Sequence, residues 1–177
     1  MERILVPPRK ALELTGLSAA TLREWTSRRA LIPADIAPRK RGASARFSWQ
    51  TILVIRIAIV LRDQFCVELQ AHQRVLAELR SELEQRSFIG LWDKLLMLEG
   101  PGAWHLVDSA SAEELHRDGS IIHLDPHLEL LSRQFALPVK ASRDSQLDFF
   151  PGLALANQYG VPGEPRVGSE HGRQSVA

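Results

Sequence analysis

The first apolar residues of the chain predict two short helices separated by a tight turn. A pair of prolines begins a helix over residues 9–14, and Gly16 suits the left-handed conformation that often follows a helix. Ser18 is a natural N-cap for a second helix over residues 19–29. Two short helices joined by a glycine-containing turn are typical of a helix-turn-helix.

A basic segment and a strongly apolar helix follow this pair. Residues 34–46 have no apolar periodicity, which predicts an exposed loop or hairpin, a wing. Its cations are Arg39, Lys40, Arg41 and Arg46. Ser48 caps a third helix that runs to about Phe65 and has apolar stripes on two faces. We therefore expect this helix to be largely buried and to close the core of the head.

The next helix, predicted over residues 67–86, has the spacing of a coiled-coil seam. The seam residues are Leu69, His72, Leu76, Leu79 and Leu83. Because the stripe spans only about two to three heptads, two alternatives stay open. The stripe packs on the preceding helices, or it joins two copies of the chain.

The residues after this helix predict a small unit of mixed α and β structure. Residues 88–98 are apolar enough to be buried, and short strands are expected over residues 104–107 and 120–124. Between the strands, a capping box at Ser111 opens a short helix that stops at Gly119.

A last helix and a polar tail complete the chain. The helix is expected over residues 126–136, because Asp125 and Pro126 supply an N-cap and a first position. It should bury Leu128, Leu131 and Phe135. The residues beyond are rich in Gly, Pro and Ser, which predicts a mostly disordered tail with residues 149–155 as a candidate docking segment.

These elements together predict a mainly α fold with a small α/β part. The predicted parts are a winged helix-turn-helix head at residues 1–66, a linking or dimerisation helix at 67–87, a small C-terminal mixed α/β unit at 88–139 and a disordered tail at 140–177.

The net charge of +1 conceals an uneven distribution. Residues 1–62 contain 12 Lys and Arg against 4 Asp and Glu, a net charge of +8, whereas the remaining residues contain 10 against 17, a net charge of −7. A basic head on an acidic body is typical of a protein that binds nucleic acid with one part of its surface.

Between Leu12 and Phe65 the sequence resembles the MerR family of winged helix-turn-helix regulators. The motifs that carry the resemblance are Thr15-Gly16-Leu17-Ser18, Thr21-Leu22-Arg23 with Trp25, Leu31-Ile32-Pro33, and Arg46-Phe47-Ser48 before the apolar helix. The sequence departs from the family at Glu24, where a second aromatic residue is usual, and at Ala30, where a glycine is usual. The resemblance implies a bacterial regulator that binds a near-palindromic DNA site as a homodimer.

The expected DNA contacts follow from the geometry of a helix in the major groove, which presents its N-terminal turns to the base edges. The positions placed to read bases are Ser18, Ala20, Thr21 and Glu24. The cations placed to neutralise phosphates are Arg23, Arg28 and Arg29, and the four cations of the basic segment should grip the backbone or a minor groove. For Trp25 we expect core packing between helices.

Other chemistry has little support in the sequence. His123 and His127 are four residues apart, but Pro126 at a helix start separates them, so no metal site is predicted. The chain has no nucleophile elbow, glycine-rich phosphate loop or dinucleotide fingerprint, so neither catalysis nor a cofactor is expected. Cys66 is the only cysteine, and we expect it to be a buried small hydrophobe.

The expected location is the cytoplasm, at the nucleoid. The chain contains no apolar run long enough for a membrane span, and its first residues lack the features of a secretory signal. No membrane partner is therefore expected.

The combined prediction is a sequence-specific DNA-binding transcriptional regulator that acts as a homodimer on double-stranded DNA. RNA polymerase or another regulatory protein is a candidate further partner. Two alternatives stay open. One is an excisionase-like or architectural factor that bends DNA for recombination, and the other is a protein-interaction adaptor whose helix-turn-helix fold has lost DNA binding.

Overall fold

One long helix lies at the centre of the structure, and the other elements pack around it. The computed structural model describes residues 4–38, 43–114 and 118–140. The central helix α3 (Trp49–Asp63) contacts α1 (Pro8–Thr15), α4 (Gln73–Gln85) and α5 (Asp125–Phe135). Its buried apolar residues are Ile52, Leu53, Val54, Ile55, Ile57, Ala58 and Leu61. The prediction of a largely buried third helix is therefore confirmed.

The two predicted N-terminal helices are present, with the predicted caps. The N–H of Gly16, which has φ of 70°, donates to the Leu12 carbonyl at 2.8 Å and ends α1. The Ser18 hydroxyl accepts from the Thr21 N–H at 3.1 Å and begins α2 (Ala19–Arg23). The second helix does not continue as an α-helix to residue 29, because α2 passes into one π-helical turn, η1 (Glu24–Arg28).

A three-stranded antiparallel sheet supplies the β part of the fold. Its strands β1 (Lys94–Leu98), β2 (Trp104–Asp108) and β3 (Ser120–His123) lie in the order β2-β1-β3. The two edge strands match the predicted ones. The central strand was predicted only as a buried apolar segment, and it is preceded by a short 3-10 helix, η2 (Ile89–Leu91).

The connection between β2 and β3 differs in part from the predicted helix. A 3-10 helix, η3 (Ser109–Glu114), begins two residues before the predicted capping box. The predicted continuation over residues 115–117 lies outside the described residues. At the return to the sheet, a Cβ on Gly119 would lie 2.6 Å from the Leu98 carbonyl oxygen, so this close approach requires glycine.

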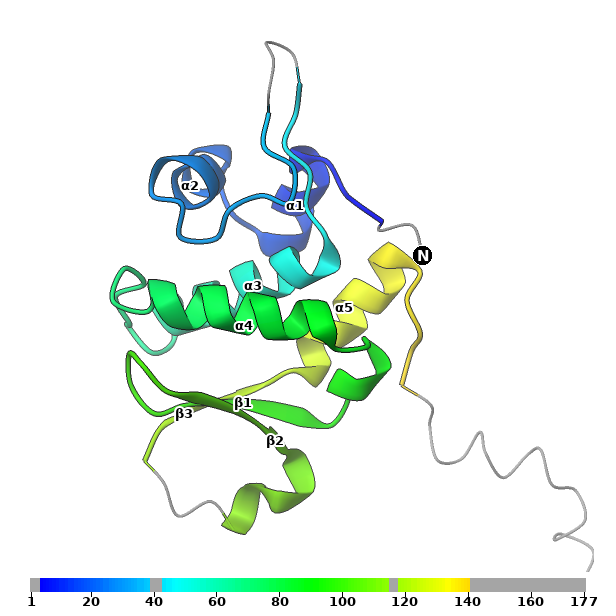
Figure 1. Cartoon of the computed structure of the whole chain (residues 1–177). Helices are drawn as coiled ribbons and strands as arrows, with labels where there is room; N and C mark the ends of the chain where they lie inside the picture. Colours follow the sequence, from blue (N-terminus) through cyan, green and yellow to red (C-terminus); the bar gives the residue numbers. More distant parts are fainter. Residues whose placement is uncertain (1–3, 39–42, 115–117, 141–177) are drawn as a thin grey trace, which may run out of the picture. The chain divides into compact units, whose positions relative to one another are not determined.

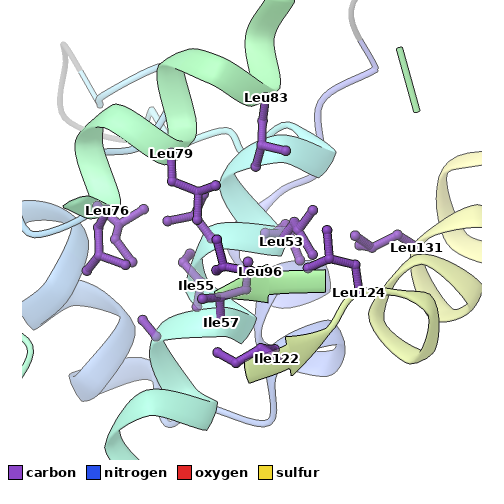
Figure 2. Close-up of a cluster of buried hydrophobic side chains, with 14 of the residues drawn as sticks. Leu53, Ile55, Ile57, Leu76, Leu79, Leu83, Leu96, Ile122, Leu124 and Leu131 are labelled. Carbon is purple, nitrogen blue, oxygen red and sulfur yellow. The ribbon is translucent and has the colours of Figure 1, made fainter. Parts of the chain in front are cut away.

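The sheet, α4 and α5 all contribute side chains to the core around α3. In the strand register, Leu96 lies opposite Leu106 on one side and Ile122 on the other. Figure 2 shows Leu96 and Ile122 in the same cluster as isoleucines of α3 and leucines of α4. The sheet and the α1–α2 pair lie on opposite sides of α3 and α4 (Figure 1). One apolar cluster thus joins residues of all three predicted folded parts, and the boundaries between those parts stay predictions.

The leucine seam of α4 packs inside the chain. Four of its five predicted members are buried, namely Leu69, Leu76, Leu79 and Leu83. The fifth, His72, immediately precedes α4, which begins six residues later than predicted. The stripe therefore packs on the preceding helices, which is the first of the two alternatives. The buried leucines leave no coiled-coil seam on α4 for a second copy.

The prediction that Cys66 is a buried hydrophobe is wrong. The α3 helix ends at Asp63, and Cys66 has a positive φ of 54°, which turns the chain out of the helical path. The Cys66 side chain is exposed, and Phe65, expected on the buried stripe, is 39% exposed. An early helix end thus removed two expected residues from the core.

The predicted C-terminal helix is confirmed, and the tail is not described. Leu128, Leu131 and Phe135 of α5 are buried as expected. The predicted disordered region, with its apolar segment at residues 149–155, lies outside the described residues. The fold of the described part is therefore mixed α/β, with a small antiparallel sheet packed on a group of helices.

A partly buried arginine of α3, Arg56, joins this helix to α1 and α5. Arg56 donates through Nη1 to the Leu14 carbonyl at the end of α1, and through Nε to His127 Nδ1 of α5 at 3.1 Å. Burial lowers the pKa of Arg56 below its usual value. Burial and, secondarily, the charge of Arg56 lower the pKa of His127 from 6.5 to about 4. His127 is therefore neutral at pH 7 and accepts the arginine N–H through Nδ1.

The stability of the fold should decrease in acid because of His127. Its folded-state pKa of about 4 lies below the reference value of 6.5, so the unfolded chain binds this proton first as the pH falls. The contribution is complete above pH 6.5 and is lost as the pH falls towards 4, with a limit of about 3 kcal/mol.

Urea unfolding at about pH 7 and about pH 4.5 measures this loss. The His127→Asn variant, whose amide oxygen can still accept from Arg56, should lose less stability in acid than the wild type. The half-exposed His105 supplies the control, and His105→Gln should keep the wild-type loss. An equal acid loss in all three proteins would contradict the assignment.

Candidate nucleic-acid interface

The helix α2 and its π-helical turn are seated on α3 by an aromatic anchor. Trp25 is only 6% exposed, and the guanidinium of Arg62 from α3 lies 5.0 Å from its ring centroid. Leu22, one turn earlier, is buried as well. The expected core packing of Trp25 is confirmed. Because these two residues fix the inner face, the outer face of α2 points to solvent with Ala20 and Arg23 exposed.

The predicted base-reading residues differ in exposure and in bonding. Ala20 is exposed and Thr21 is partly buried. The Ser18 hydroxyl serves as the helix cap, and it lies 2.9 Å from the Thr21 hydroxyl. These two hydroxyl groups bond to each other at the N-terminus of α2, the end that the sequence predicts to face the bases.

Arg23 lines a groove beside α2. It forms no hydrogen bond or ion pair with the residues that the structure describes. The groove has a volume of about 260 Å³, and apolar side chains of Leu12, Leu22 and Phe47 contribute to its lining. Residues 43–45 of the basic segment also line it. A free cation thus stands at the edge of a groove between α2 and the predicted basic segment.

Glu24 pairs with two arginines, Arg28 and Arg29. The Glu24 carboxylate lies 2.9 Å from Nε of Arg29 and 3.7 Å from Nη1 of Arg28. The sequence predicts that Glu24 reads bases while the two arginines bind phosphates. In the structure the carboxylate pairs with both arginines, which stay largely exposed, and the predicted DNA contacts of the three residues stay predictions.

The basic segment is held at its base by two antiparallel pairs. Arg46 exchanges backbone hydrogen bonds with Ile36, at 3.0 and 3.2 Å, and Phe47 does so with Val6, at 2.8 and 3.0 Å. The Arg46 side chain is exposed and has no bonding partner among the described residues. The other three predicted cations, Arg39, Lys40 and Arg41, lie outside the described residues.

A buried carboxylate that the sequence analysis did not identify holds the start of this segment. Asp35 is 4% exposed and accepts from the Ser48 N–H at 2.7 Å and the Ser48 hydroxyl at 2.9 Å. It also pairs with Arg80 of α4 at 3.2 Å, and Arg80 bonds to the Pro33 carbonyl. Asp35 and Arg80 are 45 residues apart, a separation at which no local pattern operates. The pair holds the segment against α3 and α4.

The described residues offer little to other kinds of site. Among them, no group of three His, Cys, Asp or Glu side chains could hold a metal ion. His127, one of the two histidines considered for zinc, bonds to Arg56 instead. In the same part of the chain, none of the helices has the length and apolar character needed to cross a membrane.

Comparison with known proteins identified no relative. No protein family, no curated protein and no solved structure matches the chain. The resemblance to MerR regulators therefore rests on the motifs of the first third of the sequence.

Removing the Asp35 carboxylate should destabilise the fold. Asp35→Ala removes the buried carboxylate that pairs with Arg80 and leaves the Ser48 N–H without its acceptor, which should cost about 2–4 kcal/mol in urea unfolding. Asp63, which pairs with Arg62 but is 51% exposed, is the matched control. Asp63→Ala should leave the unfolding midpoint nearly unchanged. Equal effects of the two substitutions would show that the buried network does not hold the segment.

Proposed function

We propose that the chain is a sequence-specific DNA-binding transcriptional regulator of MerR-like type, with a winged helix-turn-helix head. The observation that carries the proposal is the exposed Arg23 on the outer face of α2, which lines the groove and has no bonding partner among the described residues. Arg46, exposed and likewise without a partner in that part of the chain, lies between Ala45 and Phe47, which also line the groove. Exposed cations on α2 and on the neighbouring basic segment suit contact with the phosphates of a duplex.

The charge of the head supports the same proposal. Residues 1–62 have a net charge of +8, and a concentration of cations on one part of the surface attracts a polyanion. Ala20, on the exposed face of α2, adds a small side chain where a close approach to bases is needed. In this proposal α2 enters the major groove while the basic segment contacts the adjacent backbone.

The homodimer is part of the proposal, because one head with a short helix offers few contacts and two-fold DNA sites favour two heads. The dimer would use a surface other than the buried leucines of α4. A regulatory protein such as RNA polymerase is the proposed further partner. The site of action would then be the nucleoid.

Binding to duplex DNA should fall steeply as the salt concentration rises. If four to six cations contact phosphates, the log-log slope of affinity against salt should be roughly −4 to −5 per head. Arg23→Ala and Arg46→Ala should each weaken binding about three- to tenfold and reduce the slope by about one. Arg74, an exposed cation of α4 paired with Glu78, is the control whose replacement by Ala should change neither quantity.

Genome-wide mapping of bound sites, followed by gel shifts on those sites, measures these effects. Unchanged affinity in both arginine variants would favour a protein-interaction adaptor. A large bend in permuted sites, without any promoter response, would favour an architectural or excisionase-like factor. A shallow salt dependence would contradict DNA binding through this face.

A further inference from the structure

We propose that Glu24 competes with DNA phosphates for Arg28 and Arg29, and so restrains binding to non-specific duplex. The inference rests on the proposed function, because it concerns how the same face meets DNA. It assigns to Glu24 a role that differs from base reading, namely that of an internal carboxylate that stands in for a phosphate.

The winding of the helix builds this contact. In an α-helix, residues five apart point about 140° away from each other around the axis, so Glu24 and Arg29 would not meet. Here the Arg29 N–H donates to the Glu24 carbonyl at 2.8 Å, the bond of a π-helical turn. The wider turn brings Arg29 back over Glu24, where Nε donates to Oε1 at 2.9 Å.

Both oxygens of the carboxylate are engaged. While Oε1 bonds to Arg29, Oε2 lies 3.7 Å from Nη1 of Arg28. Among the described residues, Arg23 on the same helical run has no such partner. The structure therefore divides the cations of this face into one that is free and two that Glu24 neutralises in part.

The contact is weak enough for DNA to replace it. Glu24 is 33% exposed, and Arg28 and Arg29 are 77% and 59% exposed, so water and salt screen both pairs. A phosphate that comes close can take over either arginine. A duplex held only through Arg23 and Arg46 leaves the Glu24 contact intact, and only a fully seated duplex gains the other two cations.

The test separates this competition from simple repulsion between Glu24 and DNA. Glu24→Gln keeps the size of the side chain and removes its charge, and it should raise the affinity for a mixed-sequence duplex about two- to fivefold at low salt. If Glu24 acts through the two arginines, this gain should disappear in an Arg28→Ala/Arg29→Ala background. In an Arg23→Ala background the gain should persist.

A second glutamate provides the control. Glu13 pairs with Lys10 on the exposed side of α1 at 3.0 Å and is 52% exposed. Glu13→Gln removes the same charge from the head, and we expect a gain clearly smaller than that of Glu24→Gln. Circular dichroism of every variant establishes that the helices are retained.

Each possible result supports or contradicts competition between Glu24 and the DNA phosphates. An equal gain in both arginine backgrounds would mean general repulsion and would overturn the competition, as would the absence of any gain from Glu24→Gln. In those cases the wild-type protein still binds DNA, so the proposed function stands. If the wild-type protein binds no duplex at all, the proposed function fails and the inference fails with it.

Discussion

The burial of most of α3 is the constraint on which the rest of the structure depends. A helix with apolar residues on more than one face is stable in water only when other elements cover those faces. The covering elements come from distant parts of the sequence. Helix α1 lies near the start of the described residues and α5 near their end. The sheet and α4 complete the cover. Because the leucines of α4 are buried inside the chain, they cannot also form a dimer seam.

The same helix sets the geometry of the candidate interface. Arg62 near its end stacks on Trp25 and fixes which face of α2 turns outward, while Ser48 at its start bonds to Asp35 and anchors the basic segment. The lining of the groove includes the sequence neighbours of both attachments, Thr26 next to Trp25 and Phe47 next to Ser48. The position of Arg23 relative to the basic segment thus follows from contacts made on the buried side. Destabilising those contacts would therefore alter the interface without changing any residue in it.

Local signals in the sequence predicted much of the fold, and long-range contacts account for the rest. Ser18 and Gly16 were recognisable because a cap depends on its immediate neighbours. The strand at residues 94–98 was not, since Leu95 to Leu98 are all buried and give no alternation. At the site, the sequence identified Arg23 but missed the bond between Glu24 and Arg29, because that bond needs a π-helical turn which no spacing rule for α-helices includes.

The pairing of charges also changes what the composition of the head implies. The net charge of +8 counts every cation of residues 1–62 equally. In the structure, Arg56 is partly buried and bonded to a carbonyl and a histidine, and Arg62 pairs with Asp63 and lies over an indole ring. Two further arginines share Glu24. The attraction for a polyanion therefore depends less on the total charge than on which cations lack partners, and pairing in the free protein determines which cations those are.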